Sequence, residues 1–414
     1  MCMFFSTEET AALEADLEAR FLRYVRVGTT SDPSSTSKPS TPQQLELLQI
    51  LHQELAQLSP EYLEALPGYV VARFAARQSS EPCLALIAHV DTSPDAPGDN
   101  VNPQVHRHYQ GQPLTLPGGP VLDPAENPLL TAYLGKTIIT SDGTTLLGAD
   151  DKAGVAEILT AVTWVLQAPQ AHGPFEVVFT TDEEIGRGAE NFPFDRLKSR
   201  FAYTVDGGEE GGIEAECYHA SHTQVTFEGH SHHPGTARGR LINAVTMAAW
   251  FVSQLPRSES PEATDGRYGC LWANRITGTV EQAQVEVFCR DFDRQQLLRR
   301  QESLSHYARA VEASFPGGKV TLKTQQQYTN MKEGLDQHPE VLERLIAAAQ
   351  KAGVPTFSQS IRGGTDGARL TELGLPTPNL FTGGMNYHSR TEWVALPAMA
   401  SAAKTLIALL QSEG

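Results

Sequence analysis

Gly148-Ala149-Asp150-Asp151-Lys152-Ala153-Gly154 stands between a short apolar run at 145–147 and an amphipathic run at 155–165. Apolar residues in the second run recur at helical spacing, so we predict a strand that leads directly into a helix. In an open α/β sheet, such junctions at the carboxyl ends of strands form the ligand crevice. A carboxylate at a helix start is also an ordinary helix cap. The stretch therefore favours an α/β fold and leaves Asp150 as either a binding group or a cap.

Length and composition are typical of a soluble protein with more than one domain. The chain has 414 residues, whereas single cores rarely grow beyond about 250–300 residues. Its 40% hydrophobic and 20% charged residues match ordinary soluble proteins. The chain contains no run of about 18 apolar residues, so we expect no membrane-spanning helix.

The charge balance and the cysteines exclude several kinds of partner and site. The 32 basic and 49 acidic side chains give a net charge of −17, which repels phosphate backbones, so we expect no nucleic-acid partner. The five cysteines contain no Cys-x-x-Cys pair, which argues against a thiolate zinc site and a disulfide framework. Because residues 1–10 also lack a signal-peptide pattern, we expect a cytoplasmic location.

A histidine or a carboxylate follows each of five strand-like segments. These segments lie at 84–88, 145–147, 175–180, 201–205 and 379–381. The residues that follow them are His89 and Asp91, Asp150, Glu183 and Glu184, Asp206, and, beyond two glycines, His388. Continuous apolar runs are typical of strands that are buried on both faces. Because sheet geometry gathers the ends of such strands, we expect these side chains to share one edge.

The pattern changes between about residues 217 and 328. Strand-like and helical segments follow there in the order β-α-β-β-α-β, which is the order of a ferredoxin-like unit. We therefore predict an α/β protein in which 1–216 and 329–414 form a discontinuous domain with a mostly parallel central sheet flanked by helices. Residues 217–328 would be inserted into it. The Ser-, Thr- and Pro-rich run 31–42 is predicted to be a surface loop.

The five candidate ligands fit a pair of divalent metal ions. His89, Asp150, Glu184, Asp206 and His388 offer two imidazoles and three carboxylates without a thiolate. This set suits Zn²⁺, Co²⁺ or Mn²⁺. Five ligands are too many for one catalytic ion, but they suit two ions that share a bridging carboxylate.

Two neighbouring carboxylates can complete such a site. One of Glu183 and Glu184 can bind metal while the other takes a proton from water. Asp91 can accept a hydrogen bond from the second nitrogen of His89. The alternatives are a solvated acidic turn for the two glutamates and an Asx-turn for Asp91.

The sequence resembles the M20 family of di-zinc metallopeptidases, and within it the tripeptide aminopeptidases. The motifs that carry the resemblance occur in the family's order across nearly the whole chain: 88–95, 147–154, 181–186, 203–208, 233–237, 290–294, 362–367 and 379–384. The departures are the run 34–42, the His-rich tract with His230, His232 and His233, Ser389 where glycine is more usual, and His219 where asparagine is expected. They affect the shape of the pocket rather than the five ligands.

The resemblance implies a role for each site residue. His89 and Asp206 would hold one Zn²⁺, Glu184 and His388 the other, and Asp150 would bridge the two ions in each subunit, with Co²⁺ or Mn²⁺ as possible substitutes. Glu183 would be the general base, and Asp91 would orient His89. His233 of the inserted lid or dimerisation domain would reach the neighbouring subunit's site and stabilise the oxyanion, which makes a homodimer the expected assembly.

The implied activity is hydrolysis of short peptides, with release of the N-terminal residue from tripeptides. Arg290 and Arg362 are candidates for gripping the C-terminal carboxylate, because guanidinium pairs bidentately with carboxylate. The alternative for each arginine is a structural salt bridge. Asn243 is a further substrate-binding candidate. Two other functions stay open: another M20 activity, such as a dipeptidase or an N-acyl amino acid amidohydrolase, and a metal-binding interaction module without catalysis.

Overall fold

The computed structural model describes residues 5–411, which form two compact units. Of the described residues, unit 1 comprises 5–215, 334–359 and 365–411, and unit 2 comprises 216–333 and 360–364. No helix in the described part of the chain is both long and apolar enough to cross a membrane. The assignment of catalysis to the discontinuous unit and of dimerisation to the inserted one stays a prediction.

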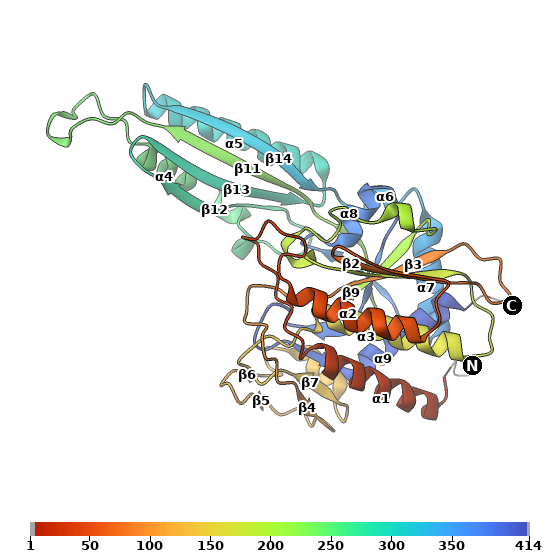
Figure 1. Cartoon of the computed structure of the whole chain (residues 1–414). Coiled ribbons are helices and arrows are strands. Elements are labelled where there is room, and N and C mark those ends of the chain that lie inside the picture. Colours follow the sequence, from red (N-terminus) through yellow and green to blue (C-terminus); the bar gives the residue numbers. More distant parts are fainter. Residues whose placement is uncertain (1–4, 412–414) are drawn as a thin grey trace. The chain divides into compact units, whose positions relative to one another are not determined.

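Unit 1 is built on an eight-stranded sheet (Figure 1). Its strands, in spatial order, are β1 (Tyr62–Leu66), β2 (Tyr69–Phe74), β8 (Phe175–Thr180), β3 (Leu84–His89), β9 (Ala202–Gly207), β16 (Asn379–Phe381), β10 (Gly212–Cys217) and β15 (Phe357–Ile361). The middle strands β8, β3, β9 and β16 pair in parallel. The pairs β1–β2, β2–β8 and β16–β10 are antiparallel. The predicted α/β class is confirmed, and the sheet is mixed with a parallel middle.

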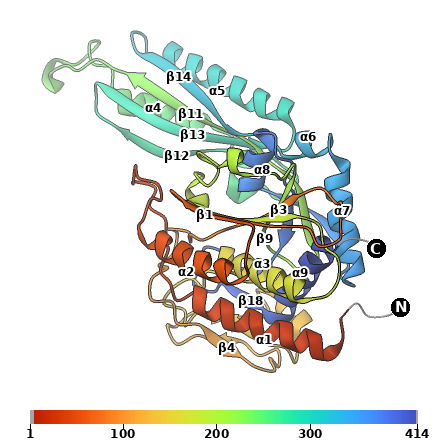
Figure 2. The ribbon, with the colours of Figure 1, turned by 45° about the vertical axis from the view of Figure 1, so that its right-hand side comes forward.

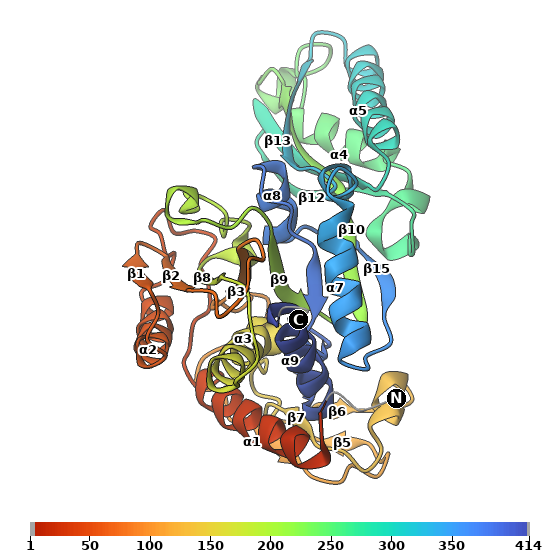
Figure 3. The same ribbon diagram turned by 90° about the vertical axis from the view of Figure 1, so that its right-hand side faces the viewer.

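Alternating side chains of this sheet enter two apolar cores. On one face, Leu86 and Val177 pack with helices, and on the other, Ile87 and Val178 pack with Leu370. The helices of unit 1 are α1 (Thr7–Tyr24), α2 (Gln43–Gln57), α3 (Ala149–Gln167), α7 (Pro339–Lys351), α8 (Asp366–Glu372) and α9 (Leu396–Leu410), with the short α6 (Lys332–Leu335) at the boundary between the units. Figure 3 shows α1, α3 and α9 packed beside one another. Strands that are buried on both faces are mostly apolar. Four of the five apolar runs identified in the sequence, at 84–88, 175–180, 201–205 and 379–381, accordingly correspond to the central strands β3, β8, β9 and β16.

Two smaller sheets complete unit 1. One has the order β17 (Gly384–Met385), β18 (Trp393–Ala395), β7 (Ile138–Thr140), β4 (Gln104–His106), and the other pairs β5 (Leu114–Thr115) with β6 (Val121–Leu122). In the first of these sheets, β17 and β18 precede and follow His388 in the sequence, and β7 precedes Asp150.

Unit 2 has the predicted β-α-β-β-α-β order. It consists of β11 (His219–Glu228), α4 (Ala244–Gln254), β12 (Cys270–Gly278), β13 (Gln282–Asp291), α5 (Arg294–Ser314) and β14 (Lys319–Tyr328). The strands form an antiparallel sheet in the order β12-β13-β11-β14. The helices α4 and α5 cover one face of it (Figure 2), where Val225, Val287 and Leu304 share a core.

Two local predictions need correction. Residues 145–147 do not form a strand, and the preceding strand β7 ends at Thr140. The short apolar run is buried as an irregular segment, so Asp150 arrives from a loop. The run 31–42 lacks helix and strand as predicted, but it is not wholly at the surface, because Ser31 and Ser40 are buried.

Candidate active site

The loop after β3 places His89 and Asp91 at the centre of the site. His89 Nε2 lies 3.0 Å from Asp150 Oδ1 and 3.5 Å from Asp206 Oδ1. Its Nδ1 lies 3.1 Å from the Asp91 carbonyl oxygen and 3.4 Å from Asp91 Oδ1. His89 is 3% exposed and Asp91 is fully buried. One ring nitrogen therefore faces the carboxylates, while Asp91 contacts the other.

Glu183 and Glu184 come from the neighbouring strand end. Strands β3 and β8 are parallel with His89 opposite Thr180, so the residues that follow them lie side by side. The Asp91 carboxylate accepts hydrogen bonds from the backbone N–H groups of Glu183 at 3.1 Å and Glu184 at 3.2 Å. The two glutamates form a short 3-10 turn and are partly buried rather than solvated. Asp91 thus links the His89 loop to the two glutamates and does not form an Asx-turn.

Asp150 lies between the two histidines. Its Oδ1 contacts His89, and its Oδ2 lies 3.4 Å from Nε2 of His388. The same His388 nitrogen lies 2.9 Å from Glu184 Oε2. The cap of α3 is Gly148, without a side-chain hydrogen bond, and Asp150 itself has non-helical backbone angles. The Asp150 side chain therefore faces the site and does not cap the helix.

Among residues 5–411, two overlapping groups of three residues are suited to metal binding. One contains His89, Asp150 and Glu184, and the other contains His89, Asp206 and Asp151. Asp151 was not predicted as a site residue. Its Oδ2 accepts a hydrogen bond from the His89 backbone N–H at 3.1 Å, and its Oδ1 is buried without a hydrogen-bond partner.

The electrostatics of the cluster fit divalent cations. Burial and the neighbouring Asp150 raise the pKa of Glu184 to about 8 and that of Asp206 to about 7. Hydrogen bonds to Asp150 and Glu184 raise the pKa of His388 to about 11. Burial alone lowers the pKa of His89, but the carboxylate of Asp206 and those of other neighbours hold it well above its ordinary value. Buried carboxylates that repel one another need positive charge, and Glu184 Oε1 has no hydrogen-bond partner. The donor set therefore suits divalent metal ions.

Supporting contacts around the ligands come from residues that the sequence patterns did not single out. Glu392 is 1% exposed, and it accepts backbone hydrogen bonds from Leu147, Gly148 and Asp150 at 2.7–3.1 Å. Asp95 Oδ2 lies 3.1 Å from Nδ1 of His388. No local pattern signals Glu392, because its partners lie more than 240 residues earlier in the chain.

Glu183 has a partner of its own. Its Oε1 accepts a hydrogen bond from the backbone N–H of Asp366 at 3.1 Å. Burial and then the Asp366 carboxylate raise the pKa of Glu183 well above its ordinary value. The Asp366 backbone N–H thereby orients one carboxylate oxygen of Glu183.

The remaining predicted residues lie in unit 2. His233 is exposed in the loop after β11, and its Nδ1 accepts a hydrogen bond from the Gly235 backbone N–H at 3.1 Å. Asn243 caps α4, because its Oδ1 accepts hydrogen bonds from Val245 N at 2.9 Å and Thr246 N at 3.3 Å. The catalytic role of His233 and the substrate contact of Asn243 stay predictions.

The two predicted carboxylate-gripping arginines differ in their surroundings. Arg362 donates to the backbone carbonyls of Gly266, Tyr268 and Thr264 at 3.0–3.1 Å, so its guanidinium is held within unit 2. Within the described part of the chain, the Arg290 side chain donates a single, long hydrogen bond of 3.5 Å to the Arg362 carbonyl. Its Nε is buried without a hydrogen-bond partner. Between the two, Arg290 is therefore the stronger candidate for an external carboxylate.

Arg290 also lies among aromatic rings. Its guanidinium carbon lies 5.4 Å from the ring centre of Trp272 and 6.0 Å from that of Tyr328. No carboxylate forms an ion pair with it among residues 5–411.

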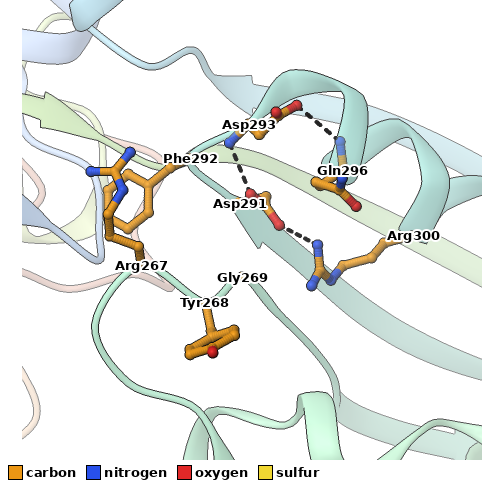
Figure 4. A pocket seen from close by; sticks show the side chains of 8 residues that line it. All are labelled: Arg267, Tyr268, Gly269, Asp291, Phe292, Asp293, Gln296 and Arg300. Carbon is orange, nitrogen blue, oxygen red and sulfur yellow. Dashed lines mark hydrogen bonds and ion pairs between the residues drawn. The ribbon is translucent and has the colours of Figure 1, made fainter.

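A pocket of about 540 Å³ in unit 2 contains arginines that, unlike Arg290, are paired with carboxylates (Figure 4). It is lined by Arg267, Tyr268, Gly269, Asp291, Phe292, Asp293, Gln296 and Arg300. Arg300 pairs with Asp291 and, at 2.8 Å, with Glu259. Arg267 pairs with Glu216 and stacks on Phe292. Because both guanidinium groups are neutralised within the unit, we assign no ligand to this pocket.

Comparisons with known proteins agree with these features. A model of peptidase family M20/M25/M40 matches residues 147–412. The chain is 42% identical over 400 residues to Peptidase T of Listeria monocytogenes serotype 4a (strain HCC23). This alignment covers 95% of this chain and 98% of that protein. The chain is 41% identical over 395 residues to Peptidase T of Clostridium perfringens (strain ATCC 13124), covering 95% and 97%. The similarity thus extends along almost the whole chain.

Solved structures show the same fold. Aminopeptidase PepT from Bacillus cereus ATCC 10987 superposes with a TM-score of 0.75 at 21% identity, covering 96% of this chain and 98% of that one. A dinuclear metal binding peptidase of family M20 from Bacillus subtilis gives a TM-score of 0.64 at 16% identity, covering 96% and 98%. The resemblance predicted from the motifs is confirmed. The chain belongs to the M20 family of peptidases.

Proposed function

We propose that this peptidase is a di-zinc aminopeptidase that releases the N-terminal residue from tripeptides. The observation that carries the proposal is the position of Asp150, whose two carboxylate oxygens contact His89 and His388 from distant parts of the sequence. This is the arrangement that a carboxylate bridging two metal ions requires. The similarity to proteins named Peptidase T supports tripeptides as the substrate.

The ligands would divide between the two ions. His89 and Asp206 would hold one, Glu184 and His388 the other, and Asp150 would contact both. When bound, the two ions would polarise the scissile carbonyl and make a water molecule more acidic. Asp91 would hold His89 in the orientation in which Nε2 faces the ions.

Proton transfer would fall to Glu183. One carboxylate oxygen is held by the Asp366 backbone N–H, so the side chain has a defined orientation. It would take a proton from the attacking water and return it to the nitrogen of the leaving amine. His233 of a second subunit would donate a hydrogen bond to the oxyanion. A homodimer is part of this proposal, and so is a cytoplasmic location, which the four free cysteines among the described residues support.

Substrate length tests the proposed function. We expect purified enzyme loaded with Zn²⁺ to cleave Ala-Ala-Ala faster than Ala-Ala or Ala-Ala-Ala-Ala, because a fixed grip on the C-terminal carboxylate admits one length. Initial rates at equal peptide concentrations measure this. Equal rates for all three lengths would reject the tripeptide proposal. Exclusive cleavage of dipeptides or of N-acetyl amino acids would instead indicate another M20 hydrolase.

Arg290 is expected to supply that grip. Replacement of Arg290 by Met should raise the KM for Ala-Ala-Ala about 10- to 100-fold, since a hydrogen bond to a charged group contributes about 1.5–3 kcal/mol. The KM for the C-terminal amide of the same peptide should change little. The matched control is Arg309→Met, an exposed residue of α5. An equal loss for the acid and the amide would assign Arg290 a structural role.

Mixing two inactive variants tests the contribution of His233. In a mixture of equal amounts of His233→Ala and Glu183→Ala subunits, half of the dimers combine one of each. One site in each mixed dimer would then contain Glu183 and receive His233, so about one quarter of wild-type activity should return. Hydrolytic activity is measured after the mixture has been unfolded and refolded, so that the subunits can form mixed dimers. No recovery in a mixture that contains mixed dimers would contradict a role across subunits.

A further inference from the structure

The segment between α1 and α2 contacts the loops that carry the site. We call residues 27–44, which comprise most of this segment and the first two residues of α2, the N-terminal brace. The brace includes the run that the sequence predicts to be a surface loop. We propose that the N-terminal brace is a positioning element that holds Glu183 and Glu184 in place through Asp182. The proposal rests on the proposed function for its catalytic consequence.

Asp182 is the main contact between the brace and the glutamates. It is fully buried, has a positive φ of 63°, and directly precedes Glu183. Its carboxylate accepts hydrogen bonds from Ser40 N at 3.0 and 2.8 Å, from Ser40 Oγ at 2.5 Å and from Gln44 Nε2 at 2.8 Å. Gln44 Oε1 in turn accepts a hydrogen bond from Asp182 N at 3.0 Å. Both the side chain and the backbone of Asp182 are thereby fixed.

The fixed backbone of Asp182 matters because of where the chain goes next. Aspartate is among the few residues that adopt a left-handed backbone without a large cost. From this turn, the N–H groups of Glu183 and Glu184 both reach the Asp91 carboxylate. A change at Asp182 would therefore rotate the backbone that presents the proposed base and one proposed metal ligand.

Lys38 holds the other end of the same loop. Its Nζ donates to the carbonyl oxygens of Arg187 and Glu190, both at 2.7 Å, and to the Tyr69 hydroxyl at 2.8 Å. Arg187 returns two hydrogen bonds to the brace, to the carbonyls of Ser35 at 3.1 Å and Ser37 at 2.9 Å. Residues 182–190 are thus attached to the brace before and after Glu183 and Glu184.

The first half of the brace contacts the loop after β3 and the start of helix α3. Ser31 N donates to the Thr92 carbonyl at 3.1 Å, and Thr92 N donates to the Thr29 carbonyl at 3.2 Å, next to Asp91. Lys152 Nζ, two residues after Asp150, donates to the Val27 carbonyl at 2.7 Å. Because catalytic groups must be held within about 0.5 Å of their working positions, these contacts make the brace part of the site's support.

Hydrogen exchange of the metal-free, full-length protein tests positioning independently of catalysis. In Ser40→Ala, the backbone N–H of residue 40 and Gln44 Nε2 can still donate to the Asp182 carboxylate, but the hydrogen bond from the hydroxyl is lost. Amides of 183–190 should therefore exchange at least about 10-fold faster. The matched control is Ser34→Ala, because the hydrogen bonds that the structure describes for Ser34 go to Asp32 in the same segment. Ser40→Thr, which keeps the hydroxyl, should restore protection. Unchanged exchange at 183–190 in Ser40→Ala would overturn the proposal.

Metal binding and kinetics give the second readout. Calorimetric titration with Zn²⁺ should show one site weakened about 10- to 100-fold in Ser40→Ala, the usual effect of losing a group that supports a ligand. The other site should keep its affinity, and kcat should fall while KM stays within about 2-fold. Unchanged zinc affinity and kcat, with only a lower Tm, would make the brace merely structural. If wild-type protein binds no Zn²⁺ or cleaves no peptide, the proposed function fails, and the exchange result still decides the positioning role.

Discussion

Replacement of Glu183 by Gln should lower kcat for tripeptide hydrolysis by about 10²- to 10⁴-fold, the usual contribution of a general acid–base group. Glutamine keeps the shape of the side chain and can still accept the hydrogen bond from Asp366 N, but it cannot take a proton from water. Because Glu183 is not one of the five proposed ligands, the protein should retain its metal. Rates with Ala-Ala-Ala and metal content by atomic absorption measure both expectations.

The matched control for this experiment is Glu126→Gln, at an exposed position of unit 1. It should leave both turnover and metal content unchanged. Turnover of Glu183→Gln at the wild-type rate would refute the assigned base. Loss of metal from this variant would instead show that Glu183 acts as a ligand.

Replacement of Asp150 by Asn should weaken metal binding and abolish hydrolysis together. Asp150 contacts both His89 and His388, so its charge would be shared by both ions. The loss of affinity for at least one Zn²⁺ should exceed about 100-fold, beyond the effect of losing a group that only supports a ligand. Equilibrium dialysis against buffered Zn²⁺ measures the number of ions bound.

Asp142→Asn is the control for this second variant. Asp142 lies in the loop that precedes the site and accepts hydrogen bonds from Thr144 at 2.6–2.9 Å. It should bind metal as the wild type does. Two tightly bound ions in Asp150→Asn would contradict a bridging role. Glu183→Gln and Asp150→Asn together also distinguish a base from a ligand, since only Asp150→Asn should release metal.

Parts of the site can be predicted from the sequence because they depend on local patterns. The apolar run at 175–180 predicts a buried strand, and β8 has these bounds. His89 ends β3, and the parallel register with β8 then places Asp91 beside Glu183. The residue types then predict the kind of site, because imidazoles and carboxylates at a shared sheet edge favour metal binding.

Other parts depend on contacts between distant segments. The predicted strand at 145–147, before Asp150, was wrong. The residues of this run are apolar like those of a strand, and they do not reveal that no neighbouring strand pairs with them. The role of the run 31–42 is equally invisible, because Ser40 and Asp182 are 142 residues apart in the sequence. Hydrophobic periodicity reports on burial of a segment, but it does not report which polar group a loop will meet.

The sequence by itself determined the α/β class, the inserted β-α-β-β-α-β unit and the five candidate ligands. These features depend directly on residue type, because apolar residues determine which strands are buried on both faces and the side chains determine which ligand atoms are offered. Only the tertiary structure decided that Glu392 holds the backbone at Asp150 and that Gln44 and Ser40 hold Asp182. These contacts exist only after the chain has folded, because hydrogen-bonded partners for buried polar groups are chosen by geometry in space.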